Sequence, residues 1–258
     1  MPDAPAEKAI RIGKLLAHAG IISRREAADF LSTHDVRIDG ERIVDLNHRI
    51  PESELPKIKL TVDRRHIVLS GSDEVILLHK PTGVACSHRR QRIRGKDLKT
   101  IFDLLPEKYA RWFFAGRLDV SSSGLVLLSN DGDHIFALSH PSHGVLKKYV
   151  VRTSRPLSDA ERARMEKGIM DKGEKLKFEK ILPLDVPAQY EIHLREGKNR
   201  EIRRLLERVG VYARQLVRIE LGPYKLGGIE VGKFSLQAKV APDILSHLTL
   251  RAPKNKQA

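Results

Sequence analysis

Residues 115–132 constrain the fold of this chain more than any other part of its sequence. The apolar run 125–128, closed by the turn residues 130–132, predicts a buried β-strand. Just before this run, Arg117 and Asp119 stand two residues apart. Because residues i and i+2 of an extended segment point to the same side, we expect both side chains to face one cleft. Asp119 is therefore our candidate for the chemical centre of the protein.

The chain carries a large excess of positive charge. Its 258 residues include 47 Lys and Arg against 33 Asp and Glu, which gives a net charge of +14. This balance favours polyanionic partners, because each Lys or Arg placed on a phosphate releases condensed counterions. The basic residues gather in the segments 8–25, 86–96 and 195–218. Such clustering favours a nucleic-acid partner over an inert basic surface.

Several other classes of protein do not fit the sequence. No apolar run approaches the roughly 18 residues that a membrane-spanning helix needs. The N-terminus lacks the basic and then apolar form of a signal peptide. Cys86 is the single cysteine, so an intrachain disulfide cannot form. We therefore expect a cytoplasmic protein without membrane association.

The N-terminal part of the chain has the pattern of a small domain. The pair Ser23 and Glu26 predicts a capping box at the start of a helix, and Asp39-Gly40 predicts a tight hairpin turn. The elements expected here are a helix over 10–19, a helix after Ser23, hairpin strands over 36–38 and 42–44, and a strand over 57–62. Residues 1–8 are rich in Pro and Ala, which predicts a loose tail.

The remainder of the chain alternates strand and helix patterns. We expect strands over 74–78, 147–151, 174–184, 190–194 and 216–221, helices over 100–105, 131–138, 158–167 and 200–209, and a basic loop over 88–96. The segment 63–73 is polar and predicts a linker. This order of elements predicts an α+β protein.

The sequence does not match several common catalytic and metal-binding motifs. A hydrolase elbow around Ser122 would need glycine where Val120 stands. A calcium loop ending at Gly132 would need acids in place of Leu127 and Ser129. His134, His140 and His143 are the closest approach to a metal-binding cluster, but their spacing matches no known metal motif. We expect neither a metal nor a cofactor.

A second segment, 196–205, supplies a basic partner for the carboxylate. Its helical periodicity places Ile202 and Leu205 inward and Arg203 at the edge of the buried face. A guanidinium in that position favours a carboxylate partner. On the residues alone, Asp119 could equally form an ion pair with Arg117.

These segments together resemble the RsuA-type pseudouridine synthases, which act on bacterial ribosomal RNA. The resemblance extends over about residues 10–245. The matching motifs, in order, are Lys80-Pro81-x-Gly83, Gly116-Arg117-Leu118-Asp119 followed by 123–125, Lys148-Tyr149, and 196–200 followed by Arg203-Arg204. Residues 11–44 are similar to a small RNA-binding domain first known from a small-subunit ribosomal protein.

The resemblance implies a role for each site residue. Asp119 would be the catalytic carboxylate, and Arg203 its salt-bridge partner. Tyr149 would stack on the target uracil and Leu216 would form an apolar floor, although the residues alone favour a plain strand aromatic and a plain core leucine. Substrate contacts would further come from Arg117, Lys80 and Arg204. Asp119 could attack the ring, attack the sugar or remove a ribose proton.

The RNA contacts expected elsewhere lie in the basic segments. They are Arg11, Lys14, Ser23, Arg24, Arg25, Arg89, Arg90, Arg92, Arg94, Lys198 and Arg200. The expected domains are a small RNA-binding domain over 9–62, a linker over 63–73 and a catalytic domain over 74–246, with flexible tails over 1–8 and 247–258. The catalytic domain should hold a mixed, mainly antiparallel sheet with flanking helices.

The expected function is the isomerisation of uridine to pseudouridine in ribosomal RNA. The segment 199–201 resembles the branches that act on large-subunit rRNA more than the small-subunit branch. The alternatives are a small-subunit substrate, and a non-catalytic RNA-binding protein of ribosome assembly. A DNA-binding regulator would leave most of the chain unexplained. We expect a monomer whose partner is rRNA or a ribosome-assembly intermediate.

Overall fold

The computed structural model describes residues 9–22, 26–67, 74–93 and 95–240. These residues form two compact units. The first unit runs to residue 67 and includes 111–113 and 130–132, and the second begins at residue 74 and includes the rest. The predicted tails 1–8 and 247–258 lie outside the described residues, as do positions 68–73 of the predicted linker.

The first unit combines two short helices with small antiparallel sheets. Its elements are β1 (Ala9–Arg11), α1 (Ile12–His18), α2 (Ala27–Thr33), β2 (Val36–Ile38), β3 (Glu41–Arg42), β4 (Arg49–Pro51), β5 (Leu60–Val62) and β6 (Arg65–Ile67). Four strands pair in the order β3-β2-β5-β6, and β1 pairs with β4. Ile12, Leu16, Val36 and Leu60 are fully buried in its core. The predicted helices and hairpin of this unit are therefore confirmed.

Two predicted boundaries in this unit are wrong. Helix α2 begins at Ala27 with Glu26 as its N-cap, and Ser23, the predicted cap, lies outside the described residues. The predicted linker starts too early, because residues 65–67 form β6 and pair with β5. Asp63 and Arg64 make the two-residue turn between these strands, with φ of 47° and 66°. Two positive φ angles are what a tight hairpin turn requires.

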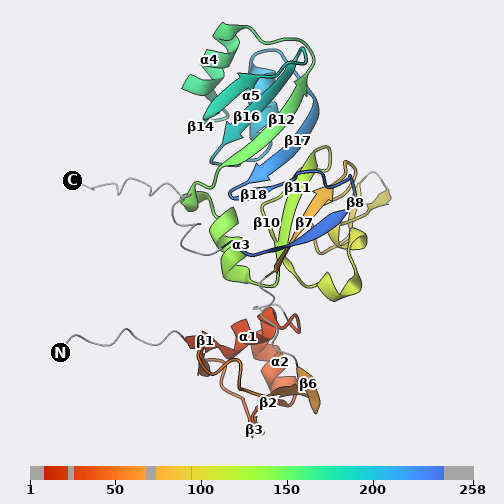
Figure 1. The fold of residues 1–258 in the computed structure, drawn as a ribbon, viewed down its shortest axis with the longest axis vertical. Helices are drawn as coiled ribbons and strands as arrows, with labels where there is room; N and C mark the ends of the chain where they lie inside the picture. The colour runs from red at the N-terminus through yellow and green to blue at the C-terminus, as the bar shows by residue number, and fades with distance from the viewer. Residues whose placement is uncertain (1–8, 23–25, 68–73, 94, 241–258) are drawn as a thin grey trace, which may run out of the picture. The chain divides into compact units, whose positions relative to one another are not determined.

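The second unit is built on a nine-stranded sheet, in which β12, β16 and β17 lie side by side (Figure 1). Its strands are β7 (Glu74–Lys80), β10 (Phe113–Ala115), β11 (Ser123–Ser129), β12 (Lys147–Thr153), β15 (Lys180–Pro183), β16 (Gln189–Leu194), β17 (Ala213–Leu221), β18 (Tyr224–Lys225) and β19 (Phe234–Ala238). The main order is β15-β16-β12-β17-β11-β7-β19, with β10 beside β11 and β18 beside β17. The predicted α+β fold is confirmed.

Helices and small hairpins complete this unit. They are β8 (Gln91–Ile93), β9 (Lys96–Leu98), the 3-10 helices Ile101–Leu104, Glu107–Tyr109 and Pro141–His143, α3 (Gly132–Ser139), α4 (Asp159–Lys167), β13 (Ile169–Asp171), β14 (Glu174–Leu176) and α5 (Glu201–Arg208). The prediction of a basic loop over 88–96 is thus wrong in part, because the hairpin β8–β9 begins inside this segment and extends beyond it. The predicted single strand over 174–184 is wrong, because β14 and β15 are separate strands in different sheets. Strands β10, β13, β18 and β19 were not predicted. Within the described ranges, no helix is long and apolar enough to cross a membrane.

Strand β11 confirms the prediction made from its apolar run, and it sits in an unusual pairing. Leu125, Val126, Leu127 and Leu128 are fully buried. Strand β11 pairs antiparallel with β7 but parallel with β17, where Gly124 lies opposite Arg218. Gly124 has a φ of +111°, and a Cβ atom there would overlap the backbone N and O atoms of Arg218. Glycine is therefore required for the two strands to approach this closely.

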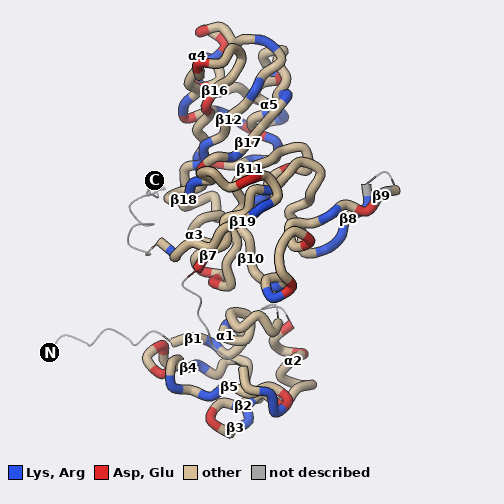
Figure 2. Tube along the Cα trace, turned by 45° about the vertical axis from the view of Figure 1, so that its right-hand side comes forward, with Lys and Arg blue, Asp and Glu red and all other residues tan. Residues whose placement is uncertain are grey.

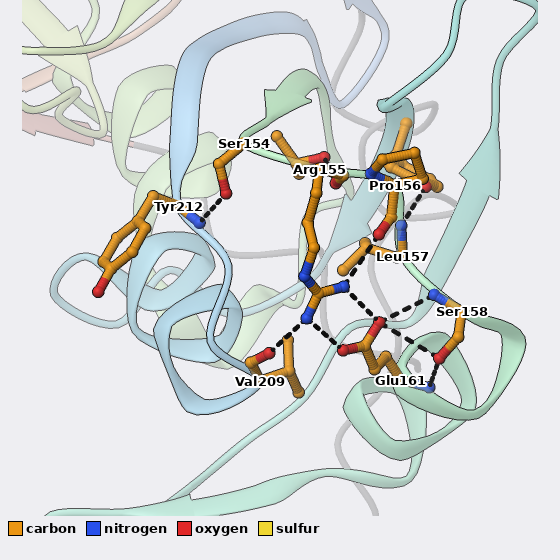
Figure 3. Close-up of polar contacts among 10 residues, drawn as sticks. Ser154, Arg155, Pro156, Leu157, Ser158, Glu161, Val209 and Tyr212 are labelled. Carbon is orange, nitrogen blue, oxygen red and sulfur yellow. Dashed lines mark hydrogen bonds and ion pairs between the residues drawn. The ribbon is translucent and has the colours of Figure 1, made fainter.

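A network of hydrogen bonds joins the start of α4 to the end of α5 (Figure 3). Ser158 caps α4, and Glu161 completes the capping box by accepting a hydrogen bond from the Ser158 backbone N–H at 2.8 Å. Arg155 donates to both carboxylate oxygens of Glu161, at 2.7 and 3.0 Å, and to the carbonyl of Val209 at 3.1 Å. These bonds fix the C-terminal end of α5, the helix that carries Arg203.

We expect Gly124→Ala to destabilise the protein by about 1–3 kcal/mol, because it forces a strained backbone and separates β11 from β17. Urea unfolding followed by circular dichroism would measure the loss. Gly228→Ala is the matched control, because no atom lies within 4 Å of a Cβ placed there. Equal stability of the two variants would contradict the required close approach.

Glu161→Gln should alter the dependence of stability on pH. The bonds from Arg155, and then from Ser158, lower the pKa of Glu161 to about 2. The stabilisation by this carboxylate is therefore present above its unfolded pKa near 4.5 and is lost as the pH falls toward 2. We expect the variant to be less stable than the wild type at pH 7 and the difference to shrink below pH 4.5. Denaturant midpoints over this pH range test the expectation, with Glu107→Gln, at an exposed glutamate, as the control.

Candidate functional site

A cavity of about 410 Å³ opens beside the sheet of the second unit. Its walls come from the segment 116–122, from 194–203, and from side chains of β12 and β17. Arg117 and Asp119 both line it, so the prediction that these side chains share one cleft is confirmed. Sequence segments separated by more than 70 positions thus meet at one carboxylate.

Asp119 sits at the start of a tight turn between β10 and β11. The Ser122 backbone N–H donates to the Asp119 carbonyl at 3.0 Å, which closes the turn. The Asp119 side chain is half-buried, whereas Arg117 is exposed. The turn therefore presents the carboxylate to the cavity at a fixed position just before a buried strand.

Arg203 fixes this turn from α5, but by bonds other than the predicted salt bridge. Its Nη2 donates to the Ser121 carbonyl at 3.0 Å and to Ser122 Oγ at 3.3 Å, and its Nη1 donates to the Ala213 carbonyl at 3.1 Å. Across the described residues, no ion pair joins Arg203 to Asp119 within 4.0 Å. The terminal nitrogens of the guanidinium donate instead to two carbonyl oxygens and a serine hydroxyl. Burial lowers the pKa of Arg203, and the nearby charge of Asp119 opposes that shift.

Tyr149 and Leu216, which the resemblance assigns to the binding of the uracil, lie in the same cavity as Asp119. Both are largely buried and both line the cavity. Tyr149 belongs to β12 and Leu216 to β17, and these strands pair antiparallel with Val151 opposite Leu216. An aromatic ring and an apolar side chain therefore share a cavity with Asp119.

Lys80 does not reach the cavity, which contradicts its predicted substrate contact. It is fully buried, and its Nζ donates to the carbonyls of Pro81 and Val84, both at 2.8 Å. Burial lowers the pKa of this lysine to about 8, and the nearby charge of Asp119 opposes the shift. Lys80 thus stands behind the cavity wall, within electrostatic range of the carboxylate.

Arg204 also has a structural role, and its predicted substrate contact is wrong. Its Nε pairs with Asp171 at 2.5 Å and its Nη1 with Glu174 at 2.8 Å. Arg208 pairs with the same Asp171. The hairpin β13–β14, which carries both acids, draws Arg204 away from the cavity, whose lining does not include it.

The predicted RNA contacts fall in different places. Lys198 and Arg200 line the cavity, and Lys198 Nζ pairs with Glu196 at 2.8 Å. Arg90 and Arg92 belong to the segment around β8, where Figure 2 shows basic residues, and both side chains are 74% exposed. The remaining described contacts are Arg11, Lys14 and Arg89, and those outside the described residues are Ser23, Arg24, Arg25 and Arg94.

Sequence reasoning missed two cations of the cavity wall, Arg218 and Lys147. Arg218 is 1% exposed and Lys147 is 8% exposed, and both line the cavity. Burial lowers the pKa of Lys147 to about 8. Each lies two residues from a predicted site residue on the same strand, Arg218 after Leu216 and Lys147 before Tyr149. The alternation of strand faces was therefore a signal that could have found both.

The cavity is lined by carboxylate, aromatic and cationic side chains. Within the described part of the chain, no group of three or more His, Cys, Asp or Glu side chains is placed to hold a metal ion. His134, one of the histidines considered above, is instead buried with its Nε2 2.8 Å from the Tyr224 hydroxyl.

Comparison with known proteins gives consistent matches. Residues 74–208 match the family model described as RNA pseudouridylate synthase. Ribosomal large subunit pseudouridine synthase B of Haemophilus influenzae is 35% identical over 233 residues, which cover 87% of this chain and 62% of that protein. The protein of the same name from Escherichia coli (strain K12) is 34% identical over 224 residues, which cover 84% of this chain and 75% of the relative. The chain thus spans less than two thirds of the Haemophilus protein.

A solved structure supports the fold assignment. A crystal structure of pseudouridylate synthase matches with a TM-score of 0.60 and 24% sequence identity. The match covers 93% of this chain and all of the other. At this identity, the likeness concerns the fold.

Arg204→Gln should lower the thermal unfolding midpoint at pH 7, because it leaves Asp171 with one basic partner fewer. The bonds from Arg204, and then from Arg208, hold the pKa of Asp171 below its usual value of 3.8. This stabilisation is present above that value and is lost as the pH falls below it. Scanning calorimetry should therefore show a gap from the wild type at pH 7 that narrows at pH 3. Arg214→Gln, at an exposed arginine of β17, is the control, and an unchanged midpoint for Arg204→Gln would contradict the structural role.

Proposed function

We propose that this chain, which belongs to the RNA pseudouridylate synthase family, isomerises uridine to pseudouridine in large-subunit ribosomal RNA. The family assignment confirms the resemblance drawn from the sequence motifs. The observation that carries the proposal is the position of Asp119, a carboxylate on a fixed turn, in one cavity with Tyr149 and Leu216. The relatives named for the large ribosomal subunit support this choice of substrate.

The proposed reaction needs only rearrangement of the substrate. The bond from uracil N1 to ribose C1′ breaks, a bond from uracil C5 to C1′ forms, and the proton lost from C5 is balanced by one gained at N1. No electrons are gained or lost overall, so no redox group is needed. In this scheme, Asp119 is the catalytic group, while Arg203 is a positioning residue that acts through the turn 119–122.

The other cavity residues fit the binding of a flipped base. Tyr149 would stack on the uracil, which contributes about 1–3 kcal/mol per base and offsets the cost of removing it from its stack. Leu216 would contact the opposite apolar surface of the base. Arg117, which is exposed and lines the cavity beside Asp119, would hold the RNA where the base leaves it.

Basic side chains outside the cavity would bind the RNA backbone. In the second unit these are the exposed Arg90 and Arg92, together with Arg89, and in the first unit Arg11 and Lys14. Each would contribute through phosphate contacts that weaken as salt is added. We propose rRNA or a ribosome-assembly intermediate as the partner, met in the cytoplasm. We propose further that the protein acts as a monomer.

Asp119→Asn should reduce pseudouridine formation by about 10³-fold or more, because it removes the carboxylate charge while preserving side-chain size. The test maps pseudouridine in rRNA from cells that lack the gene and carry either the wild-type or the variant protein. Asp185→Asn, at an exposed aspartate outside the cavity, should restore every site that the wild type restores.

The same experiment separates the alternatives. Restoration of the modification by Asp119→Asn would indicate a non-catalytic RNA-binding role. Loss of a pseudouridine from small-subunit rRNA alone would move the substrate to that subunit. If the deletion removes no pseudouridine from rRNA, the proposed substrate class is wrong.

A further inference from the structure

Three cations are buried in or behind the wall of the cavity. Lys80, Lys147 and Arg218 are 0%, 8% and 1% exposed. The acids of the same cavity are Asp119, which is half-buried, Glu196, which is exposed, and Glu201, whose pKa is raised by burial. Burial of charges without full compensation is costly, so such groups are retained where function uses them.

Arg218 occupies the centre of this arrangement. On β17 it lies directly opposite Tyr149 of β12 and two residues after Leu216. Alternation along a strand places Leu216 and Arg218 on one face, and all three side chains line the cavity. The surface that would receive the uracil therefore includes a guanidinium beside the stacking ring.

The guanidinium of Arg218 has unused donors, unlike the two lysines. Lys147 Nζ donates to the carbonyls of Val145 and Arg195, and Lys80 Nζ to two further carbonyls. Arg218 Nε donates to the Leu125 carbonyl at 2.7 Å, whereas its Nη2 is buried without a partner among the described residues. An arginine also keeps its charge when buried, whereas burial brings both lysines toward neutrality.

Two glycines lie against Arg218. A Cβ on Gly116 would lie 3.4 Å from Arg218 Nη1, at the close end of ordinary van der Waals contact. Gly124 lies opposite the Arg218 backbone in the parallel pair, where a Cβ would overlap that backbone. The motif that carries Asp119 therefore packs against the guanidinium, and the parallel pair fixes the backbone from which the side chain extends.

We propose that Arg218 stabilises the negative charge that the uracil acquires while its bond to ribose is broken. This inference rests on the proposed function. When the N1–C1′ bond breaks, its electron pair stays on the base and spreads over N1 and the carbonyl oxygens. The pair is used again when C5 bonds to C1′, the C5 proton leaves and N1 is protonated. The charge arises on the base whether Asp119 attacks the ring, attacks the sugar or removes a ribose proton.

A fixed cation beside that charge acts strongly because Arg218 is itself buried, where charges are screened less than in water. Loss of one such donor in other enzymes costs about 10²–10³-fold in turnover. Arg218→Met retains much of the side-chain length and removes the charge. We expect its single-turnover rate on an rRNA fragment to fall by about 10²–10³-fold, with RNA affinity within about threefold of the wild type. Its thermal midpoint should stay close to that of the wild type, because the removal of a buried donor without a partner offsets the loss of the bond from Nε to the Leu125 carbonyl.

A substrate with 5-fluorouridine at the target position provides a readout that a structural role would not affect. The fluorine withdraws electrons and stabilises the same anion, so glycosidic cleavage should depend less on Arg218. We expect the ratio of wild-type to Arg218→Met cleavage rates to be at least about tenfold smaller with this substrate than with uridine. Arg218→Lys, which retains a charge, should lie between the two in its rate on uridine.

Arg152→Met, at an exposed arginine of the adjacent strand β12, is the matched control and should match the wild type throughout. The inference is overturned if Arg218→Met keeps its rate, or if the rate ratio is the same for both substrates. If Arg218→Met fails to fold, Arg218→Lys decides by the same ratio. A wild-type protein that forms no pseudouridine would overturn the proposed function. This result is distinct from an active wild type whose rate the Arg218→Met variant equals, which would overturn only the role of Arg218.

Discussion

The close approach of β11 and β17 is the constraint on which the rest of the second unit depends. It is a parallel pairing in a sheet that is mainly antiparallel, and it requires glycine opposite Arg218. On one side of this contact, the chain turns at Asp119 into β11. On the other side, β17 presents Leu216 and Arg218. The cavity therefore exists because two backbones come closer than side chains would otherwise permit.

Arg203 shows how a basic residue can serve a carboxylate without binding it. Its guanidinium holds the backbone of the turn, at the Ser121 carbonyl and Ser122 Oγ. Asp119 thereby gains a fixed position while its oxygen atoms remain available to a substrate. A direct ion pair would have to be broken or shared before the carboxylate could react. Bonds to the turn preserve the positive field of Arg203 without that cost.

The sequence predicts those features that depend on local pattern. The apolar run predicts β11, and the spacing of Arg117 and Asp119 predicts their shared cavity. Arg204 was misassigned because the direction of its side chain depends on an ion pair with Asp171. Asp171 lies in the hairpin β13–β14, which the local sequence pattern did not predict. Lys80 was misassigned because sequence cannot show which carbonyls its Nζ will meet. Arg218 was missed because a charged residue in a strand ordinarily faces solvent, and only strand alternation relative to Leu216 suggests otherwise.

The pairing of β11 with β17 also sets the order of events during synthesis. Gly124 and Arg218 are separated along the chain by β12, α4, β16 and α5, so their contact closes a long loop. Contacts of such separation form late, after more local pairs such as β15–β16. Asp119 leaves the ribosome long before Leu216 and Arg218 do. An emerging chain would therefore hold its carboxylate without a complete cavity around it until β17 has been synthesised.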